Sequence, residues 1–352
     1  MMKNKLKIVL ILLLVLITIP NVANAKDNLD LGFSITPDST EWSNYNAYEL
    51  QEKLNIPREQ VDTLNTGELL ELVLNYPFIG DVYAFNTVDD GLETIRQRFE
   101  PLDELLKRED VAEVVYQKYL DNRYTDIAKK ELVNKEYETS LKINILEILL
   151  EKDEVYAQLT DSQINQIVKK AVDIENEINI ESEFVQEGSE FKDNFDKEAL
   201  ARSAGVYTPR GSYVSVLVRG EQLSSGRKNQ INSHFDKTYP KATRLRSATT
   251  NYNCHSYAWY STSSNNKYWM NDPSPYKTDG SYRNVGFLPT ASGQKLYYPV
   301  SGGHSAIVNS TGSSIWDVNM TSKWGEAGLY RHNYGNDPYS VGPLNITNWK
   351  RN

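Results

Sequence analysis

The chain has 352 residues, which is more than one ordinary domain needs, and a formal net charge of −9. It contains a single cysteine, Cys254, so an internal disulfide is excluded. In an exported chain a lone thiol is either an intermolecular partner or a reactive group. The compartment of the protein therefore decides how Cys254 is interpreted.

The N-terminus predicts export. Three lysines precede an apolar run, Ile8–Ile19, and Ala23 and Ala25 fit a small-x-small cleavage site. The run is shorter than the roughly 20 residues that cross a bilayer. We predict a signal peptide over residues 1–25, a mature protein that is secreted or held at the cell wall, and no membrane contact beyond that peptide. An exported chain without a recognition motif also argues against nucleic acid as a partner.

Composition and charge divide the mature chain near residue 200. The residues from 206 onward carry 16 Lys and Arg against 7 Asp and Glu, a net +9; with +3 in the signal peptide, −21 remains for residues 26–205. We predict an acidic helical domain over 26–190, a linker over 191–205 and a basic domain over 206–352. Surfaces of such opposite charge attract each other, so we expect the two domains to touch.

Helix periodicity dominates the first domain. In "TGELLELVLNYP" the apolar residues crowd one side, with Thr66 placed as an N-cap and Pro77 as a stop. "SLKINILEILLEKDEVYAQL" and "TDSQINQIVKKAVDIENEI" repeat this pattern, the second opening with Thr160 or Asp161 as cap. No catalytic motif stands out among the acidic residues, which are typical of solvated helix faces.

The second domain predicts both strands and helices, so the whole chain is predicted to be α+β. "SYVSVLVRG" alternates as a strand does, and "EQLSSGRKNQINSHFDKTYP" predicts one helix that ends before Pro240. The capping residues Thr250, Asn251 and Asn253 then precede "CHSYAWYST". They predict a short helix that begins at or beside Cys254.

Cys254 is the first candidate for chemistry. A sulfur at a helix N-terminus is favoured as a thiolate, because the partial positive charge and the free N–H groups lower its pKa. The alternative is an inert thiol, since free cysteines are often buried. His255 is not the expected base, because adjacent helix residues point about 100° apart. One Cys and one His at that spacing make no zinc site, so we expect no metal.

The better partner for Cys254 is His304, which follows two glycines and opens the predicted strand "SAIVNS". "SIWDVNM" predicts the next strand, and a loop of two or four residues would place His304, Asp317 and Asn319 on one face. A loop of three residues would reverse this. Asp317 is the candidate third residue, with Asn319 and His332 as alternatives.

A cysteine at a helix start, a "GH" that opens a strand and a polar residue on the next strand resemble the papain-like amidases and peptidases of bacterial walls, the NlpC/P60 and CHAP families. The resemblance covers roughly residues 212–332, and "GGHSAIV" is close to the families' pattern. "YNCHSY" stands in place of the usual "DCSG", and "KLYYP" in place of a "GD" turn. The resemblance implies a papain-like domain with a central antiparallel sheet, in a divergent relative.

Carried onto this chain, the resemblance makes Cys254 the nucleophile, His304 the base and Asp317 the orienting residue of a hydrolase that needs no cofactor. The chemistry of the residues agrees, because a thiolate attacks carbonyls, an imidazole moves the proton and a carboxylate orients the imidazole. The backbone N–H of Cys254 is one expected oxyanion donor. Further candidates for the oxyanion or substrate pocket are Asn251, Tyr252 and Trp324.

Three functions fit these residues. The first is a secreted bacterial cysteine amidase or endopeptidase that cleaves an amide bond in a wall peptide, a peptidoglycan-like substrate or a protein. The second is a transglutaminase-like acyltransferase, which shares the Cys, His, Asp order. The third is a non-enzymatic wall-binding protein, whose 14 tyrosines and 5 tryptophans after residue 206 would meet anionic polymers and sugars.

The helical domain has two predicted roles. It either masks the cleft as a detachable segment held by charge, in which case salt weakens the masking, or it positions substrates and partners permanently. The pattern of residues 26–190 does not distinguish the two.

Overall fold

A computed structural model describes residues 32–121, 133–181, 201–340 and 345–352. Phe33–Asn352 form one compact unit, which contains residues of both predicted domains. The predicted signal peptide and residues 191–200 of the predicted linker lie outside the described residues. Within the described ranges, no helix is long and apolar enough to cross a membrane.

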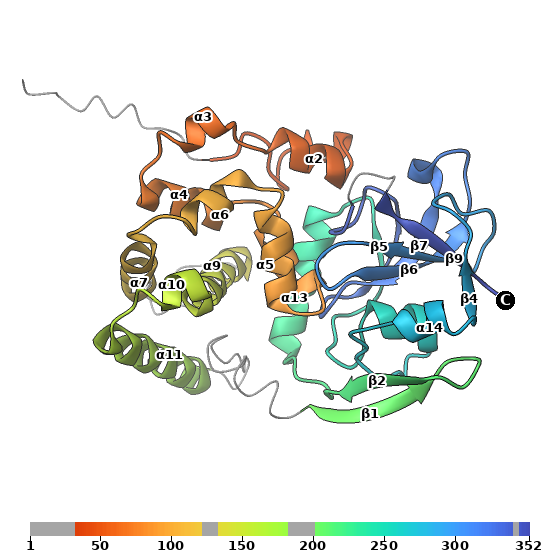
Figure 1. Cartoon of the computed structure of the whole chain (residues 1–352). Coiled ribbons are helices and arrows are strands. Elements are labelled where there is room, and N and C mark those ends of the chain that lie inside the picture. The colour runs from red at the N-terminus through yellow and green to blue at the C-terminus, as the bar shows by residue number, and fades with distance from the viewer. Residues whose placement is uncertain (1–31, 122–132, 182–200, 341–344) are drawn as a thin grey trace, which may run out of the picture. The chain divides into compact units, whose positions relative to one another are not determined.

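The N-terminal helical part, residues 33–181, is built from short helices followed by two long ones (Figure 1). Its elements are η1 (Trp42–Asn44), α2 (Ala47–Lys53), α3 (Arg58–Val61), α4 (Thr66–Leu74), η2 (Ile79–Ala84), α5 (Val88–Arg96), α6 (Glu100–Leu105), α7 (Val111–Asp121), α9 (Val133–Glu151), α10 (Asp153–Tyr156) and α11 (Asp161–Glu181). The helices predicted from periodicity are thus present, with one break after Glu151.

The helix starts show how local hydrogen bonds set the boundaries. Thr160 caps α11 as predicted, since its hydroxyl accepts from the Gln163 N–H at 3.3 Å. The prediction of Thr66 as cap of α4 is wrong by one residue. Asn65 is the cap, because its side chain accepts from the Glu68 N–H at 3.0 Å and its own N–H donates to the Glu68 carboxylate. The Thr66 hydroxyl instead donates to the Asp110 carboxylate, before α7, at 2.6 Å.

The C-terminal sheet part, residues 201–352, holds a two-stranded hairpin and a seven-stranded sheet of order β3-β8-β7-β6-β5-β9-β4. All described strand pairs are antiparallel. The elements are β1 (Arg202–Tyr207), β2 (Tyr213–Val218), α13 (Ser225–Thr238), β3 (Thr243–Arg246), η3 (Ser256–Tyr260), α14 (Ser274–Thr278), β4 (Tyr282–Asn284), β5 (Lys295–Tyr298), β6 (His304–Ser310), η4 (Ile315–Asp317), β7 (Asn319–Lys323), β8 (Leu329–Asn333) and β9 (Thr347–Arg351).

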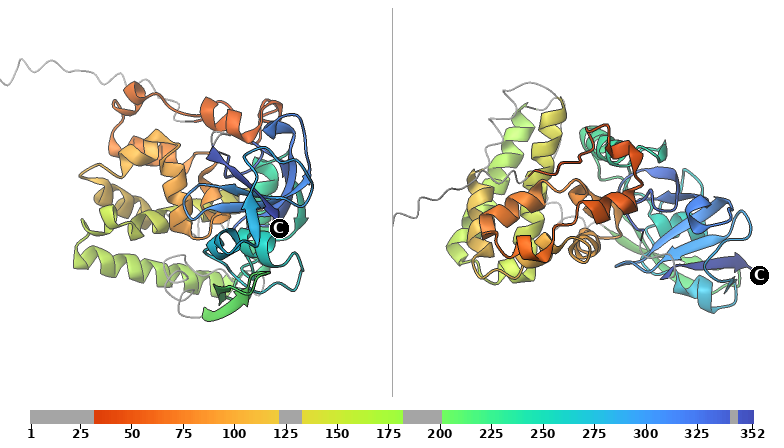
Figure 2. Two further views of the ribbon diagram at one scale, coloured as in Figure 1. Left: turned by 45° about the vertical axis from the view of Figure 1, so that its right-hand side comes forward. Right: turned by 90° about the horizontal axis from the view of Figure 1, so that it is seen from above.

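The predicted α+β class is confirmed, with helices first and an antiparallel sheet after them. The strand in "SYVSVLVRG", the helix that ends before Pro240 and the strand that begins at His304 are all present as β2, α13 and β6. Views from two further directions show the helices α4, α6 and α7 gathered on one side of this unit and the sheet on the other (Figure 2).

The hairpin predicted after β6 is wrong in its second strand. Ile315–Asp317 form the helical turn η4, and β7 begins only at Asn319. The observed register pairs Val308 with Met320 and Ser310 with Asn319. A capping box explains the turn, because the side chains of Ser314 and Asp317 cap each other's backbone N–H groups.

The register assigns side chains to the two faces of the sheet. Met320 pairs with both Val308 and His332, so these three side chains share the face of His304. Ser305, next along β6, points to the opposite face, and its hydroxyl is hydrogen-bonded to a residue at the start of η3. The cysteine-bearing turn and the His304 ring therefore lie against opposite faces of β6.

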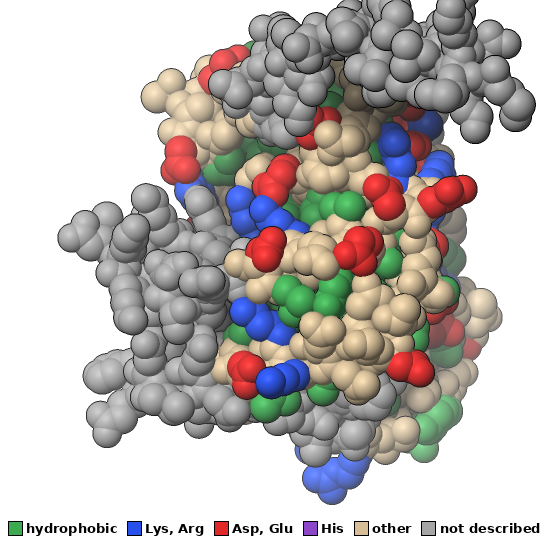
Figure 3. Space-filling view, turned by 90° about the vertical axis from the view of Figure 1, so that its left-hand side faces the viewer, with side chains coloured by type: hydrophobic (Ala, Val, Ile, Leu, Met, Phe, Trp, Pro, Cys, Tyr) green, Lys and Arg blue, Asp and Glu red, His purple; other side chains and the backbone are tan. Residues whose placement is uncertain are grey.

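The surface of the helical part is not a uniform field of negative charge. On the face shown in Figure 3, acidic and basic side chains are interspersed with apolar ones. Arg58 pairs with Glu104 at 2.8 Å, and Arg96 with Glu154 at 2.7 Å. Such internal pairing reduces the net charge with which the acidic residues act on the sheet part.

The helical part and the sheet part share a buried interface. The Trp42 indole donates to the Thr238 carbonyl at 2.9 Å, and Tyr239 donates to the Asp81 carboxylate. Phe78 packs between the Trp42 and Tyr239 rings at centroid distances of 5.3 and 5.9 Å. The exposed ion pair between Lys237 and Asp38 also joins the parts, but exposed pairs contribute about 1 kcal/mol or less to the free energy of unfolding. Packing and buried hydrogen bonds dominate these contacts.

Substitution of Trp42 tests whether this interface stabilises the fold. Trp42 is 1% exposed, so we expect Trp42→Ala to lower the free energy of unfolding by about 3–5 kcal/mol. Phe287→Ala is the control, because Phe287 is 44% exposed and its loss should cost about 1 kcal/mol or less. Urea denaturation followed by circular dichroism measures both. Equal effects of the two substitutions would contradict a buried interface at Trp42.

Candidate functional site

Cys254 begins a helical turn, as predicted. Helical structure starts at Cys254 and continues as the π-helical turn η3. Asn253 is the cap, since its side-chain oxygen accepts from the Ser256 N–H at 3.1 Å, and its amide donates to the Met270 carbonyl at 2.7 Å. Both Asn253 hydrogen bonds are buried, so they hold the backbone directly before Cys254 in place.

The Cys254 thiol is buried rather than exposed. Its residue is 2% accessible to solvent. Burial raises the pKa of Cys254 to about 12, against the opposing influence of the Ser305 and His255 backbone N–H groups and the Lys323 charge. Desolvation therefore outweighs the helix start in this state, and the predicted thiolate is not favoured. The thiol is protonated at neutral pH.

His304 lies at the start of β6 and is fully buried. Its ring stacks on Tyr339 at a centroid distance of 3.4 Å and an angle of 9°, and meets Tyr298 edge-on at 5.3 Å. Burial lowers the pKa of His304 well below its ordinary value, helped by nearby His255 and His332. Neither ring nitrogen has a hydrogen-bond partner among the described residues. The imidazole is neutral and held by aromatic rings.

The structure brings Cys254 to the start of β6 but does not join it to the His304 ring. The backbone N–H of Ser305, the residue after His304, is near enough to the sulfur to lower the pKa of Cys254. The His304 ring points to the other face of β6, toward Tyr339. The predicted pair is therefore adjacent in space and not hydrogen-bonded.

His255 has a structural role, in agreement with the prediction that it is not the base. Its Nε2 lies 3.2 Å from the Gly302 carbonyl and must donate, so Nδ1 accepts from the Ser305 hydroxyl at 2.8 Å. The Trp259 indole donates to the same hydroxyl at 2.8 Å. Burial lowers the pKa of His255 to about 4. His255 thus ties η3 to the turn before His304.

The three candidates for the third residue are engaged elsewhere. Asp317 is exposed in η4, and its carboxylate accepts from Ser313 and Ser314. Asn319 donates to the side chain of Asn333 at 2.8 Å. Neither reaches the His304 ring, because the helical turn η4 shifts the register that the prediction assumed.

His332, the last of these candidates, shares the sheet face of His304. Its Nε2 contacts the Ser322 hydroxyl at 2.8 Å, and its Nδ1 lies 3.4 Å from the Asp337 carboxylate. All of these groups are buried. They form a polar cluster on the sheet face of His304, and none of these groups is hydrogen-bonded to the His304 ring nitrogens.

The predicted pocket residues have different surroundings. Trp324 is fully buried and stacks on Tyr330 at 4.0 Å, so it belongs to the core rather than to a cleft wall. Tyr252 is also buried, and Arg246 donates to its hydroxyl at 3.3 Å. Asn251 is half-buried in the loop before Cys254. No open cleft lined by these three residues is found in the described part of the chain.

Asn86 and Tyr339 are site residues that the sequence did not indicate. The Asn86 side-chain oxygen lies 3.8 Å from the Cys254 sulfur, and Tyr339 stacks on His304. Neither residue belongs to a motif, and Asn86 comes from the helical part. Such long-range contacts leave no periodic or spacing signal in a sequence.

Lys323 is a further buried group near the cysteine. It is 0% exposed, donates to the Thr249 carbonyl at 3.0 Å and to Gly325, and lies over the Tyr252 ring at 5.4 Å. Burial lowers the pKa of Lys323 to about 7, which nearby Glu326 and Cys254 oppose. Lys323 fastens the loop that leads into Cys254.

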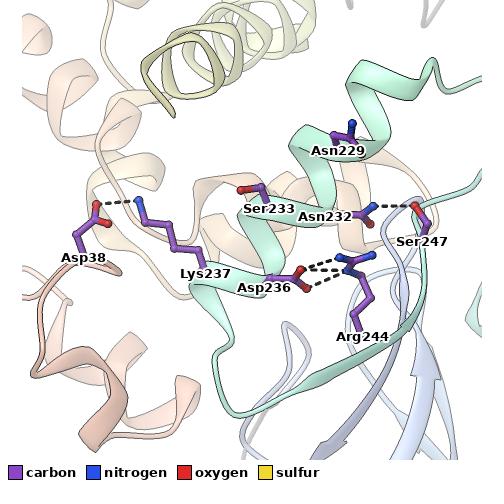
Figure 4. A pocket seen from close by; sticks show the side chains of 8 residues that line it. All are labelled: Asp38, Asn229, Asn232, Ser233, Asp236, Lys237, Arg244 and Ser247. Carbon is purple, nitrogen blue, oxygen red and sulfur yellow. Dashed lines mark hydrogen bonds and ion pairs between the residues drawn. The ribbon is translucent and has the colours of Figure 1, made fainter. Parts of the chain in front are cut away.

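A separate polar groove of about 690 Å³ runs along α13 (Figure 4). Its charged side chains are paired with each other, Asp38 with Lys237 at 2.7 Å and Asp236 with Arg244 at 2.9 Å. Cys254 and His304 do not line it. In the described residues, no group of three or more His, Cys, Asp or Glu is placed to hold a metal ion.

Comparisons with known proteins give no relative for this arrangement. No family model, curated protein or solved structure matches the chain. The candidate function therefore depends on the geometry of Cys254 and its neighbours.

The lowered pKa of the buried Lys323 predicts that the stability of the protein depends on pH. Its folded pKa of about 7 lies below the ordinary 10.5, so between these values the unfolded chain binds a proton that the folded chain has lost. Stability therefore rises with pH across this window. From pH 7 to pH 10 the free energy of unfolding of the wild type should rise by on the order of a few kcal/mol relative to that of Lys323→Met.

Urea denaturation at several pH values measures this difference. Lys350→Met, at an exposed position of β9, controls for the loss of a lysine. A difference between wild type and Lys323→Met that does not change with pH would contradict a buried, uncharged Lys323.

Proposed function

We propose that the protein is a secreted cysteine hydrolase that cleaves an amide bond in a cell-wall peptide or protein, with Cys254 as nucleophile and His304 as base. One observation carries the proposal: the single thiol begins a helical turn, and its sulfur lies 3.8 Å from the Asn86 oxygen, while the Asn86 amide donates to Gly302 in the turn before His304. A lone cysteine beside a strand that opens with histidine is also the arrangement of the NlpC/P60 and CHAP families.

The reaction follows from these two groups. His304 removes the thiol proton, the Cys254 sulfur bonds to the carbonyl carbon, and His304 gives the proton to the amine as the C–N bond breaks. Water then attacks the thioester, which releases the acid and restores the thiol. The backbone N–H of Cys254, at the start of the helical turn, would stabilise the oxyanion.

Two features would allow His304 to reach the sulfur. Gly302 and Gly303, directly before it, have φ values of +67° and +69°, which other residues rarely adopt. The ring also has no hydrogen bond that would have to be broken. Movement of this turn would therefore re-aim the imidazole without breaking a hydrogen bond of the ring itself, but it would break the bonds that the Gly302 carbonyl accepts from Asn86 and His255.

The wall substrate is supported by the chemistry of the sheet part. Residues 206–352 carry a net +9 and many aromatic side chains, which suit anionic polymers and sugars. Tyr207 and Tyr213 of the β1–β2 hairpin are 64% and 58% exposed. Exposed tyrosines provide stacking surfaces for such polymers.

Substitution of the two proposed catalytic residues tests the activity. We expect Cys254→Ala and His304→Ala each to abolish amine release from purified peptidoglycan or from an unfolded protein, because both act in one unit. Asp317→Ala should retain activity, since its exposed carboxylate caps a turn. Hydrolysis that survives either of the first two changes would refute the assignment, and amine incorporation in place of hydrolysis would indicate an acyltransferase.

A further inference from the structure

A segment of the helical part covers the candidate site. The cover segment, residues 83–90, comprises the end of η2, the connection to α5 and the first residues of α5. It meets the sheet part at three places: the turn after β7, the Cys254 sulfur, and the turn before His304. These contacts cover the Cys254 sulfur and fasten the turn before His304.

The first contact is made by the backbone of the cover segment. The Glu326 N–H donates to the Tyr83 carbonyl at 2.9 Å, and the Tyr339 hydroxyl donates to the Ala84 carbonyl. Gly325 makes this approach feasible, because a Cβ there would collide with backbone atoms of the segment. Since Tyr339 stacks on His304, the cover segment also holds the ring that immobilises the imidazole.

The second contact is made by the Asn86 side chain. Its oxygen accepts from the Asn253 amide at 2.8 Å and lies 3.8 Å from the Cys254 sulfur, while its amide donates to the Gly302 carbonyl at 2.8 Å. Both ends of the amide are thus engaged, which defines its orientation. Asn86 links the residue before the nucleophile to the turn before the base.

The direction of the Asn86 contact matters for reactivity. A carbonyl oxygen accepts from the S–H group and has no proton to offer a thiolate, so it favours the protonated thiol. The nucleophile of a cysteine hydrolase is the thiolate. In this position Asn86 therefore both blocks the sulfur sterically and opposes its ionisation.

The third contact fastens the cover segment beside Gly302. The Ser301 hydroxyl donates to the Asp90 carboxylate at 2.8 Å. Gly302 again lacks a Cβ where one would collide with that carboxylate. The turn that precedes His304 is thereby held to the start of α5.

We propose that the cover segment keeps the enzyme latent, and that hydrolysis requires its separation from Cys254 and from the turn before His304. This inference rests on the proposed function. Separation removes the Asn86 oxygen from the sulfur and releases Tyr339 from Ala84 in one movement. The contacts at the site are hydrogen bonds and close packing, so salt should not release them, unlike a mask held by net charge.

Reactivity of the single cysteine tests the cover without requiring a substrate. Iodoacetamide forms an S–C bond with loss of iodide, and intact mass counts the product. At a fixed near-neutral pH we expect Asn86→Ala to be alkylated at least about fivefold faster than wild type, the change that loss of roughly one hydrogen bond produces. Asn348→Ala is the control, because this buried asparagine donates to Gln294 on the sheet at 2.7 Å.

Ser301→Ala keeps the test valid if Asn86→Ala fails to fold. It removes only the bond to Asp90 from a half-buried position, so alkylation should rise by roughly twofold to threefold. Alkylation that is unchanged in every folded variant of this pair, or that rises equally in Asn348→Ala, would overturn the inference.

Hydrolysis measured on the same proteins separates the two proposals. Faster alkylation together with faster peptidoglycan hydrolysis supports both. Faster alkylation with no hydrolysis of any substrate would refute the proposed function and with it the latency of an enzyme. It would still show that the cover segment shields the Cys254 thiol. Full hydrolysis by wild type that the variants do not increase would uphold the proposed function and overturn the latency.

Discussion

The arrangement around Cys254 depends on the amide of Asn86. This side chain joins Asn253 to Gly302, two positions from different loops of the sheet part, through an acceptor at one end and a donor at the other. Without it, the Asn253 amide would keep only its bond to Met270 and the Gly302 carbonyl only its bond to His255, so each would lose one hydrogen bond, worth about 0.5–1.5 kcal/mol. The helical part is therefore integral to the site, since it completes hydrogen bonds that the sheet part leaves open.

Burial of Cys254 and His304 in this packing changes their protonation. Burial raises the pKa of Cys254 and lowers that of His304, so both groups are driven toward their neutral forms. A neutral thiol and a neutral imidazole cannot form the ion pair that a cysteine hydrolase uses. Access of water to the site would reverse both shifts at once. A single structural change, the removal of the cover, would thus act on Cys254 and His304 together.

Sequence patterns predicted elements better than they predicted contacts. The periodic helices, β2, α13 and β6 are where alternation and caps placed them. The errors occurred where two local solutions compete. Asn65 and Thr66 are adjacent cap residues, and Ser314 with Asp317 forms a capping box inside a segment whose apolar residues resemble a strand. That box moved Asp317 away from the sheet and removed the predicted third residue from the site.

The sequence by itself determined the α+β class, the helical turn that begins at Cys254 and the strand that begins at His304, because caps, breakers and alternation act over a few residues. The tertiary structure alone decided that both side chains are buried, that Asn86 lies on the sulfur and that Tyr339 holds the imidazole. Burial and hydrogen bonding between segments so far apart depend on how whole elements pack, and packing leaves no local pattern in the chain.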